Sequence, residues 1–161
     1  MVNYNLASGD DIKKDYNNLD INDIDLNKSF VLKECDEVLM YHIFEHLNNP
    51  YFTLKEIHRN LNNGGILKVK LPTYACNIFH KTFIHDDSYF DCQIGKNEGM
   101  IYDNDVKFKL IKSEYRSYDK KKNKKSKFIV FRFLDIFKRL YKFYKIITCT
   151  EVYFELEKIN Y

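Results

Sequence analysis

The amino-terminal part of the chain contains three short segments whose pattern of apolar and polar positions predicts strands. Residues 2–6 (VNYNL) alternate and run into small residues that allow a tight turn. Residues 16–21 (YNNLDI) are typical of a second short strand that ends in Asp20. Residues 35–41 (CDEVLMY) are apolar at nearly every position, which is typical of a strand buried on both faces. We therefore expect these segments to begin a parallel sheet.

A helix is predicted after the third strand. Asn49 suits the N-cap, Pro50 suits the first helical position, and residues 63–65 (NGG) are expected to end the helix. The apolar face of the helix is formed by Leu54, Ile57 and Leu61.

A fourth strand is predicted at residues 66–72 (ILKVKLP), where apolar and lysine residues alternate until Pro72. Lys68 and Lys70 share one face of this strand and are expected to lie on a partly open surface. Dimerisation through that side is a hypothesis.

The carboxy-terminal half predicts two more strands and a helix. Residues 105–118 and 150–159 alternate apolar and polar positions, so they predict half-buried strands that can pair as an antiparallel edge. Residues 128–147 carry a broad apolar face opposite charged side chains, which predicts a long amphipathic helix. Strands that alternate with helices in this way favour an open α/β sheet.

The length and composition of the chain limit the classes of protein to which it can belong. A chain of 161 residues with 45% hydrophobic and 16% aromatic residues can bury one core, so we expect a single domain, 1–161. We expect no signal peptide or spanning helix, because no apolar run has the required length, and we expect a cytoplasmic protein. The four cysteines lack a C-x-x-C pair and are expected to be reduced, small apolar residues: Cys35, Cys76, Cys92 and Cys149.

A local cluster of lysines stands out from the small net charge of +3. Its members, within the loop 120–127, are Lys120, Lys121, Lys122, Lys124, Lys125 and Lys127. The cluster fits a solvated loop best, and an anionic partner, either a membrane surface to which the protein attaches peripherally or a nucleic acid, stays open.

The segment 41–47 (YHIFEHL) contains a His-x-x-Glu-His pattern that can hold zinc on a helix. Here a buried strand directly precedes His42, and few residues remain before the turn at 47–50 (LNNP). The two histidines are therefore not expected to share a helical face, and we predict no metal site.

Four blocks in order resemble a known family. The segments YNLASGDDIKKDYNNLDI, CDEVLMYHIFEHL, LKEIHRNLNNGGILKVKLP and HKTFIHDDSYF, followed by EVYFELEKI, resemble the class I S-adenosylmethionine-dependent methyltransferases, in their small, type 11-like branch. The resemblance implies a Rossmann-like open sheet, mostly parallel with an antiparallel carboxy-terminal edge, in a compact version that lacks the amino-terminal helix. It divides the chain into a cofactor-binding half, 1–72, and a substrate-side half, 73–161.

The resemblance also implies a cofactor site. The glycine-rich turn that approaches the methionine part of S-adenosylmethionine corresponds to Leu6, Ala7, Ser8 and Gly9, with alanine where the family usually has glycine. Asp20, next to Ile21, corresponds to the acidic residue that accepts hydrogen bonds from the ribose hydroxyls, and Asp25 with Leu26 corresponds to the pair that meets the adenine. Only four residues separate Asp20 from Asp25, which predicts a vestigial third strand.

The remaining site residues are implied by the later blocks. Tyr41 and His42 are expected to line the cofactor pocket, and the candidates that face the substrate are Pro72, His80 and His85. Thr82 stands where the family usually has a basic residue. The resemblance names no general base, because in-line methyl transfer needs one only when the acceptor carries a proton.

The function expected from the sequence is methyl transfer from S-adenosylmethionine to an unidentified acceptor. Two alternatives remain open: a catalytically inactive cofactor-binding protein, and a basic protein that binds nucleic acid or a membrane surface.

Overall fold

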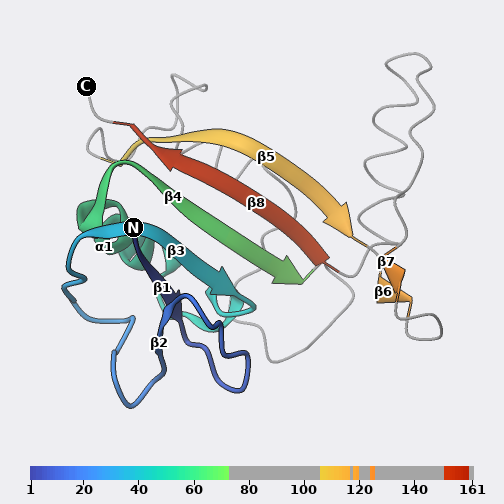
Figure 1. Ribbon diagram of the computed structural model, residues 1–161, viewed down its shortest axis with the longest axis horizontal. Helices are drawn as coiled ribbons and strands as arrows, with labels where there is room; N and C mark the ends of the chain where they lie inside the picture. Colours follow the sequence, from blue (N-terminus) through green and yellow to red (C-terminus); the bar gives the residue numbers. More distant parts are fainter. Residues whose placement is uncertain (73–105, 117, 120–123, 126–150, 160–161) are drawn as a thin grey trace.

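The computed structural model describes residues 1–72, 106–116, 118–119, 124–125 and 151–159 (Figure 1). The strands in this part of the chain are β1 (Val2–Leu6), β2 (Asn17–Leu19), β3 (Cys35–Tyr41), β4 (Leu61–Pro72), β5 (Phe108–Arg116), β6 (Tyr118–Asp119), β7 (Lys124–Lys125) and β8 (Glu151–Lys158). The helical elements are a short 3-10 helix, η1 (Phe44–His46), and the α-helix α1 (Pro50–Asn60). The long helix predicted at 128–147 lies outside the described residues.

Six strands form one sheet in the order β2-β1-β3-β4-β8-β5 (Figure 1). The pairs β1–β2, β1–β3 and β3–β4 are parallel, whereas β8 runs antiparallel to both β4 and β5. This confirms the predicted open sheet, mostly parallel with an antiparallel carboxy-terminal edge. A separate two-stranded sheet is formed by β6 and β7.

The predicted end of the helix was wrong. Asn49 caps α1 as expected, because its side-chain oxygen accepts a hydrogen bond from the Phe52 amide at 3.0 Å. The helix ends at Asn60, however, and Leu61 already has an extended backbone that begins β4. The glycines do not stop the helix: Cys35 pairs with Leu61 and Glu37 with Ile66, so residues 62–65 bulge out of the ladder.

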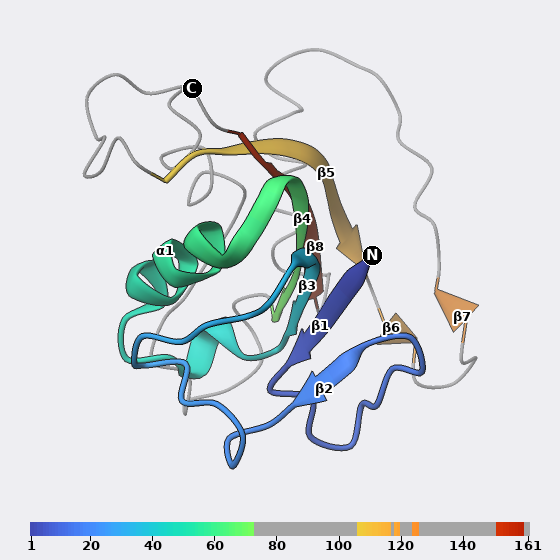
Figure 2. The same ribbon diagram turned by 60° about the vertical axis from the view of Figure 1, so that its left-hand side comes forward.

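The core lies between α1 and one face of the sheet, and Figure 2 shows the helix along that side. Its fully buried members include Val38, Met40, Leu54, Ile57, Leu67, Val69, Leu71, Val152, Phe154 and Leu156. Those of β4 and β8 occupy the alternate positions that the sequence predicted, and Leu54 and Ile57 lie on the predicted apolar face of the helix. Burying each large apolar side chain contributes about 1.5–3 kcal/mol. Cys35 also belongs to this core, where burial raises the pKa of its thiol to about 12, as expected for a small apolar residue.

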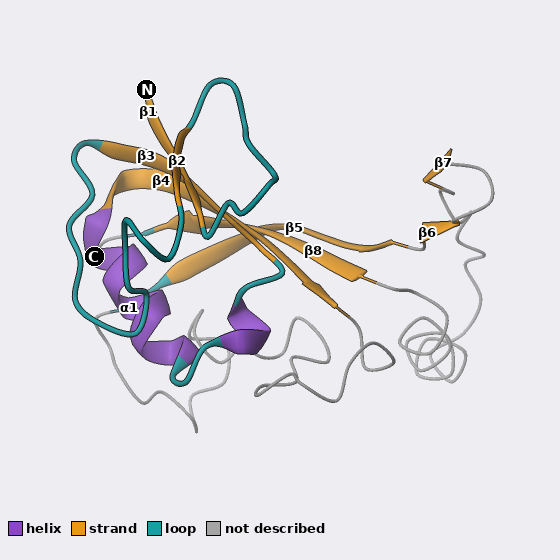
Figure 3. Cartoon of the chain, turned by 90° about the horizontal axis from the view of Figure 1, so that it is seen from below, coloured by secondary structure: helices purple, strands orange, loops and turns teal. Residues whose placement is uncertain are grey.

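The opposite face of the sheet is polar, and among the described elements α1 and η1 both lie away from it (Figure 3). Lys68 and Lys70 project there, but both are half-buried and both have partners. Lys68 Nζ lies 2.6 Å from Glu37 Oε2, and Lys70 Nζ lies 3.8 Å from the centre of the Tyr41 ring. The lysines therefore pair within the sheet, and dimerisation through this face stays a prediction.

Candidate functional site

The strand order places a ligand-binding position at the carboxyl ends of β1 and β3. The chain passes from β1 to β2 on one side and later to β3 on the other, so these two strands flank the point where the strand order reverses. In open α/β sheets, ligands bind at this position, which we call the switch point. Leu6, at the end of β1, pairs with Leu19 of β2 and with Met40 of β3. The carboxyl ends of these three strands therefore lie side by side, at one end of the sheet, which we call its carboxyl edge.

The turn after β1 has a backbone suited to close approach by a ligand. Ala7 and Gly9 both have positive φ, at 53° and 46°, and the Ser8 amide donates to the Leu19 carbonyl at 3.2 Å. A Cβ atom added at Gly9 would meet nothing within 4 Å. The turn therefore leaves open space beside Gly9, which fits the glycine-rich turn that the resemblance implies.

Asn5 and Asn18, which the sequence did not single out, hold the loop after this turn in place. The buried Asn5 side chain donates hydrogen bonds to the Asp11 carbonyl at 2.7 Å and to Asn18 Oδ1 at 2.9 Å. Asn18 Oδ1 also accepts from the Lys13 amide at 2.9 Å. This network ties the loop between β1 and β2 to both strands. The available signal was that Asn5 takes a polar position in the alternating strand β1, next to the turn.

Asp20 directly follows β2, on the same edge as Ala7. Its amide donates to Asp23 Oδ2 at 2.9 Å, and its carbonyl accepts from the amides of Asp23 and Ile24. Within the described part of the chain, the hydrogen bonds of Asp20 use its backbone, which leaves the carboxylate able to accept from a ligand. Ile21 beside it is 80% exposed.

Asp25 and Leu26 lie in the segment between β2 and β3, which contains no strand, as predicted for a vestigial third strand. The Asp25 carboxylate accepts from the Asn27 amide at 3.0 Å and pairs with Lys28 at 3.0 Å. The amide first and the lysine second lower the pKa of this carboxyl group. Leu26 is buried in the core. Their contact with an adenine ring stays a prediction.

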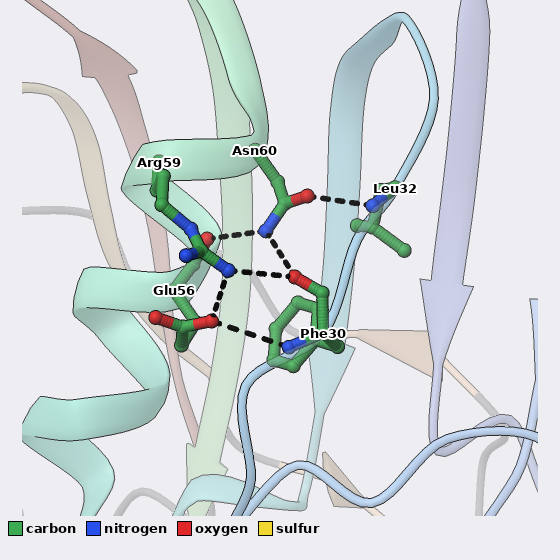
Figure 4. Close-up of polar contacts among 5 residues, drawn as sticks. All are labelled: Phe30, Leu32, Glu56, Arg59 and Asn60. Atoms are coloured by element: carbon green, nitrogen blue, oxygen red, sulfur yellow. Dashed lines mark hydrogen bonds and ion pairs between the residues drawn. The ribbon is translucent and has the colours of Figure 1, made fainter.

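A polar cluster on α1 anchors the end of this strandless segment (Figure 4). Asn60 Oδ1 accepts from the Leu32 amide at 2.6 Å, and its Nδ2 donates to the Phe30 carbonyl at 3.0 Å. Glu56 Oε2 accepts from the Phe30 amide at 3.2 Å and pairs with Arg59 at 2.6 Å. Side chains of the helix thus supply hydrogen-bond partners for the backbone of Phe30 and Leu32.

Tyr41 is the last residue of β3, and His42 follows it at the switch point. The His42 amide donates to the Lys70 carbonyl at 2.9 Å, and His42 has a positive φ of 58°. Its Nε2 lies 3.3 Å from Glu151 Oε2, and its Nδ1 lies 3.7 Å from Glu45 Oε1. The 3-10 helix begins only at Phe44, so His42 and His46 do not share a helical face. In the described residues, no group of side chains forms a metal site.

The structure describes only some of the other predicted site residues. Pro72 ends β4 and pairs with Glu151 across the sheet, on the edge that carries the switch point. Three residues of the substrate-side block lie outside the described residues: His80, Thr82 and His85. Of the lysine cluster, Lys124 and Lys125 form β7, and partners for the cluster stay a prediction. Among the described helices, none is long and apolar enough to cross a membrane.

Known proteins resemble this chain in sequence and in fold. Residues 5–69 match the model of a methyltransferase domain family. The chain is similar in structure to an S-adenosylmethionine-dependent methyltransferase from Archaeoglobus fulgidus, with a TM-score of 0.60 and 13% identity over 98% of this chain and 86% of the other. It is also similar to a structure of a Haloferax volcanii methyltransferase complex with the Trm112 activator, with a TM-score of 0.59 and 14% identity over 99% and 83% of the two chains. No curated protein matches the sequence.

The open turn at Ala7–Gly9 and the carboxylate of Asp20 fit the cofactor that this family indicates, S-adenosylmethionine. The identity to the solved structures is low, so they establish the shared fold. The family match over residues 5–69, together with that fold, confirms the resemblance: the chain is similar to the class I S-adenosylmethionine-dependent methyltransferases of the type 11-like branch.

Proposed function

We propose that this protein transfers a methyl group from S-adenosylmethionine to an acceptor that is still to be identified. The observation that carries the proposal is the register of the sheet. Leu6 pairs with both Leu19 and Met40, so the carboxyl ends of β1, β2 and β3 lie side by side. The turn at Ala7–Gly9 follows β1 there, Asp20 follows β2, and Tyr41 is the last residue of β3. The family match supports methyl transfer in general, and the acceptor is the part that the proposal leaves for experiment.

Each of these residues has a distinct role in the proposal. The backbone of Ala7–Gly9 lies against the methionine part of the cofactor, and Asp20 accepts hydrogen bonds from the ribose hydroxyls, because a carboxylate presents only acceptors. When bound, the cofactor supplies an electrophilic methyl group on a sulfonium. The protein then raises the rate chiefly by holding the acceptor in line with that methyl group.

A second candidate is a protein that binds the cofactor without catalysis. Ala7 favours it, since a side chain occupies the turn where the family usually has glycine and the backbone has a φ of 53°. This candidate predicts cofactor binding without turnover for any acceptor. A basic protein that binds an anionic partner through Lys120–Lys127 predicts instead an affinity that falls steeply with salt.

Calorimetric titration with S-adenosylmethionine and S-adenosylhomocysteine tests the cofactor site. We expect micromolar affinity, which is about −8 kcal/mol. Asp20→Ala should weaken binding about 10- to 100-fold, because it removes hydrogen bonds between a charged acceptor and the ribose. Asp15→Asn is the matched control, since this exposed residue precedes β2 at the opposite edge of the sheet. Equal affinity in wild type and Asp20→Ala would count against the assigned site.

A further inference from the structure

Three ionisable side chains meet beside the switch point. His42 follows β3, Glu45 belongs to η1 and Glu151 begins β8. Glu151 Oε2 lies 3.3 Å from His42 Nε2, and Glu45 Oε1 lies 3.7 Å from His42 Nδ1. A carboxylate therefore lies near each nitrogen of the imidazole ring.

The topology of the sheet explains this meeting. β8 runs antiparallel to β4, and Glu151 pairs with Pro72, the last residue of β4. The amino end of β8 thus lies on the same edge as the carboxyl ends of β1, β3 and β4. Glu151 reaches His42 although 109 positions separate them in the sequence.

Burial distinguishes the three side chains. The side chain of His42 is 46% exposed, whereas those of Glu151 and Glu45 are 20% and 3% exposed. A second substrate that arrives at the switch point can therefore reach the imidazole, while Glu45 is held within the protein. The backbone of His42 is fixed as well, since its amide donates to the Lys70 carbonyl.

We propose that His42 is the general base that accepts a proton from the methyl acceptor, and that the acceptor attacks through a hydroxyl or an amine. This inference rests on the proposed function. An oxygen or nitrogen lone pair of the acceptor bonds to the methyl carbon, the carbon–sulfur bond breaks with its electron pair left on sulfur, and the acceptor's proton moves to His42 Nδ1. Of the two carboxylate contacts, only that at Nε2 has hydrogen-bond length, so Nε2–H donates to Glu151 and leaves the lone pair on Nδ1.

The two glutamates act through the histidine. Glu151 is a positioning residue, because its hydrogen bond selects the tautomer and the orientation of the ring, as the carboxylate does in a catalytic triad. Glu45 lies beside the nitrogen that takes the proton, and its carboxylate stabilises the imidazolium that forms. An acceptor whose attacking atom carries no proton would need none of these three groups.

The test compares probes that carry a proton on the attacking atom with probes that do not. Phenol and 2-aminoethanol carry one, whereas pyridine and dimethyl sulfide do not. Formation of S-adenosylhomocysteine is measured for the full chain at saturating S-adenosylmethionine, with wild type, His42→Gln and His42→Ala. His46→Gln is the matched control, an exposed histidine of η1 four positions away. Circular dichroism and thermal unfolding establish that each variant folds.

We expect wild type and His46→Gln to methylate phenol or 2-aminoethanol at similar rates. His42→Gln should lower that rate about 100-fold or more, the usual contribution of a general base. Any turnover of pyridine or dimethyl sulfide should be unaffected, and free imidazole should restore part of the activity of His42→Ala.

Three results would overturn the inference. One is an equal loss of turnover for both kinds of probe in His42→Gln, which indicates a structural role. The second is a wild-type rate in that variant with phenol or 2-aminoethanol. The third is a wild-type protein that binds S-adenosylmethionine but methylates neither of these two probes. Absence of cofactor binding in calorimetry is a different result, since it removes the proposed function itself.

Discussion

Ala7 and His42 leave two neighbouring parallel strands in the same left-handed backbone conformation, with φ of 53° and 58°. Ala7 follows β1 and His42 follows β3, on the two sides of the point where the strand order reverses. Residues other than glycine adopt this conformation at a cost, and it is found preferentially at functional sites. The backbone thus turns sharply on both sides of the position where the cofactor is proposed to bind.

Ala7→Gly should stabilise the protein. The left-handed conformation costs an L-residue about 1–2 kcal/mol, and glycine loses about 0.5–1 kcal/mol through its more flexible unfolded chain. The expected net gain in the free energy of unfolding is up to about 1.5 kcal/mol, measured by urea denaturation.

Gly9→Ala provides the opposite change in the same turn. Gly9 has a φ of 46°, and an added Cβ would meet no atom within 4 Å, so the strain would come from the backbone alone. We expect a loss of about 1 kcal/mol. Stabilisation by Gly9→Ala together with destabilisation by Ala7→Gly would contradict this account of the turn.

Asn60→Ala should loosen the segment that precedes β3. The change removes the partner of the Leu32 amide and one partner of the Phe30 carbonyl (Figure 4). Loss of these bonds should lower the free energy of unfolding by about 1–3 kcal/mol. Asn63→Ala is the control, because Asn63 is exposed in the bulge of β4. Similar losses in the two variants would show that the cluster on α1 contributes little.

Tyr16 should make the stability of the protein depend on alkaline pH. Burial, and then the hydrogen bond of its hydroxyl to Glu37, raise the pKa of Tyr16 well above its ordinary value. The unfolded chain loses this proton first, near about pH 10. The stabilisation is therefore complete below about pH 10 and is lost as the pH rises toward the pKa of the folded state.

Tyr16→Phe tests this dependence. Urea denaturation at about pH 8 and about pH 10.5 should show a smaller loss of stability in the variant than in wild type. Glu37→Gln should also reduce the loss, since it removes the carboxylate that contributes to the shift. An unchanged pH dependence in both variants would refute the proposed role of the pair.

Local patterns in the sequence predicted most of the fold. The alternation in residues 66–72 placed Leu67, Val69 and Leu71 in the core, and the Asn49–Pro50 pair marked the start of α1. The end of α1 was not predicted, because Leu61 satisfies the apolar period of the helix and also begins β4. Leu61 thus fits both patterns, and its pairing with Cys35 in the sheet places it in β4 and not in the helix.

The candidate site was predicted only where residues close in sequence form it. The turn at Ala7–Gly9 and the position of Asp20 follow from strands and the turns after them. Glu151 could not be assigned to His42, because their contact depends on the antiparallel direction of β8 and on a strand register that no local pattern encodes.

The most direct test of the central claim is amide chemical-shift mapping by NMR during titration with S-adenosylhomocysteine. The account predicts that the largest shifts fall on Ala7, Ser8, Gly9, Asp20 and His42, the residues that follow β1, β2 and β3 at the switch point. Shifts confined to the opposite edge of the sheet, around Asp36 and Asn62, or no shifts at saturating ligand, would contradict it.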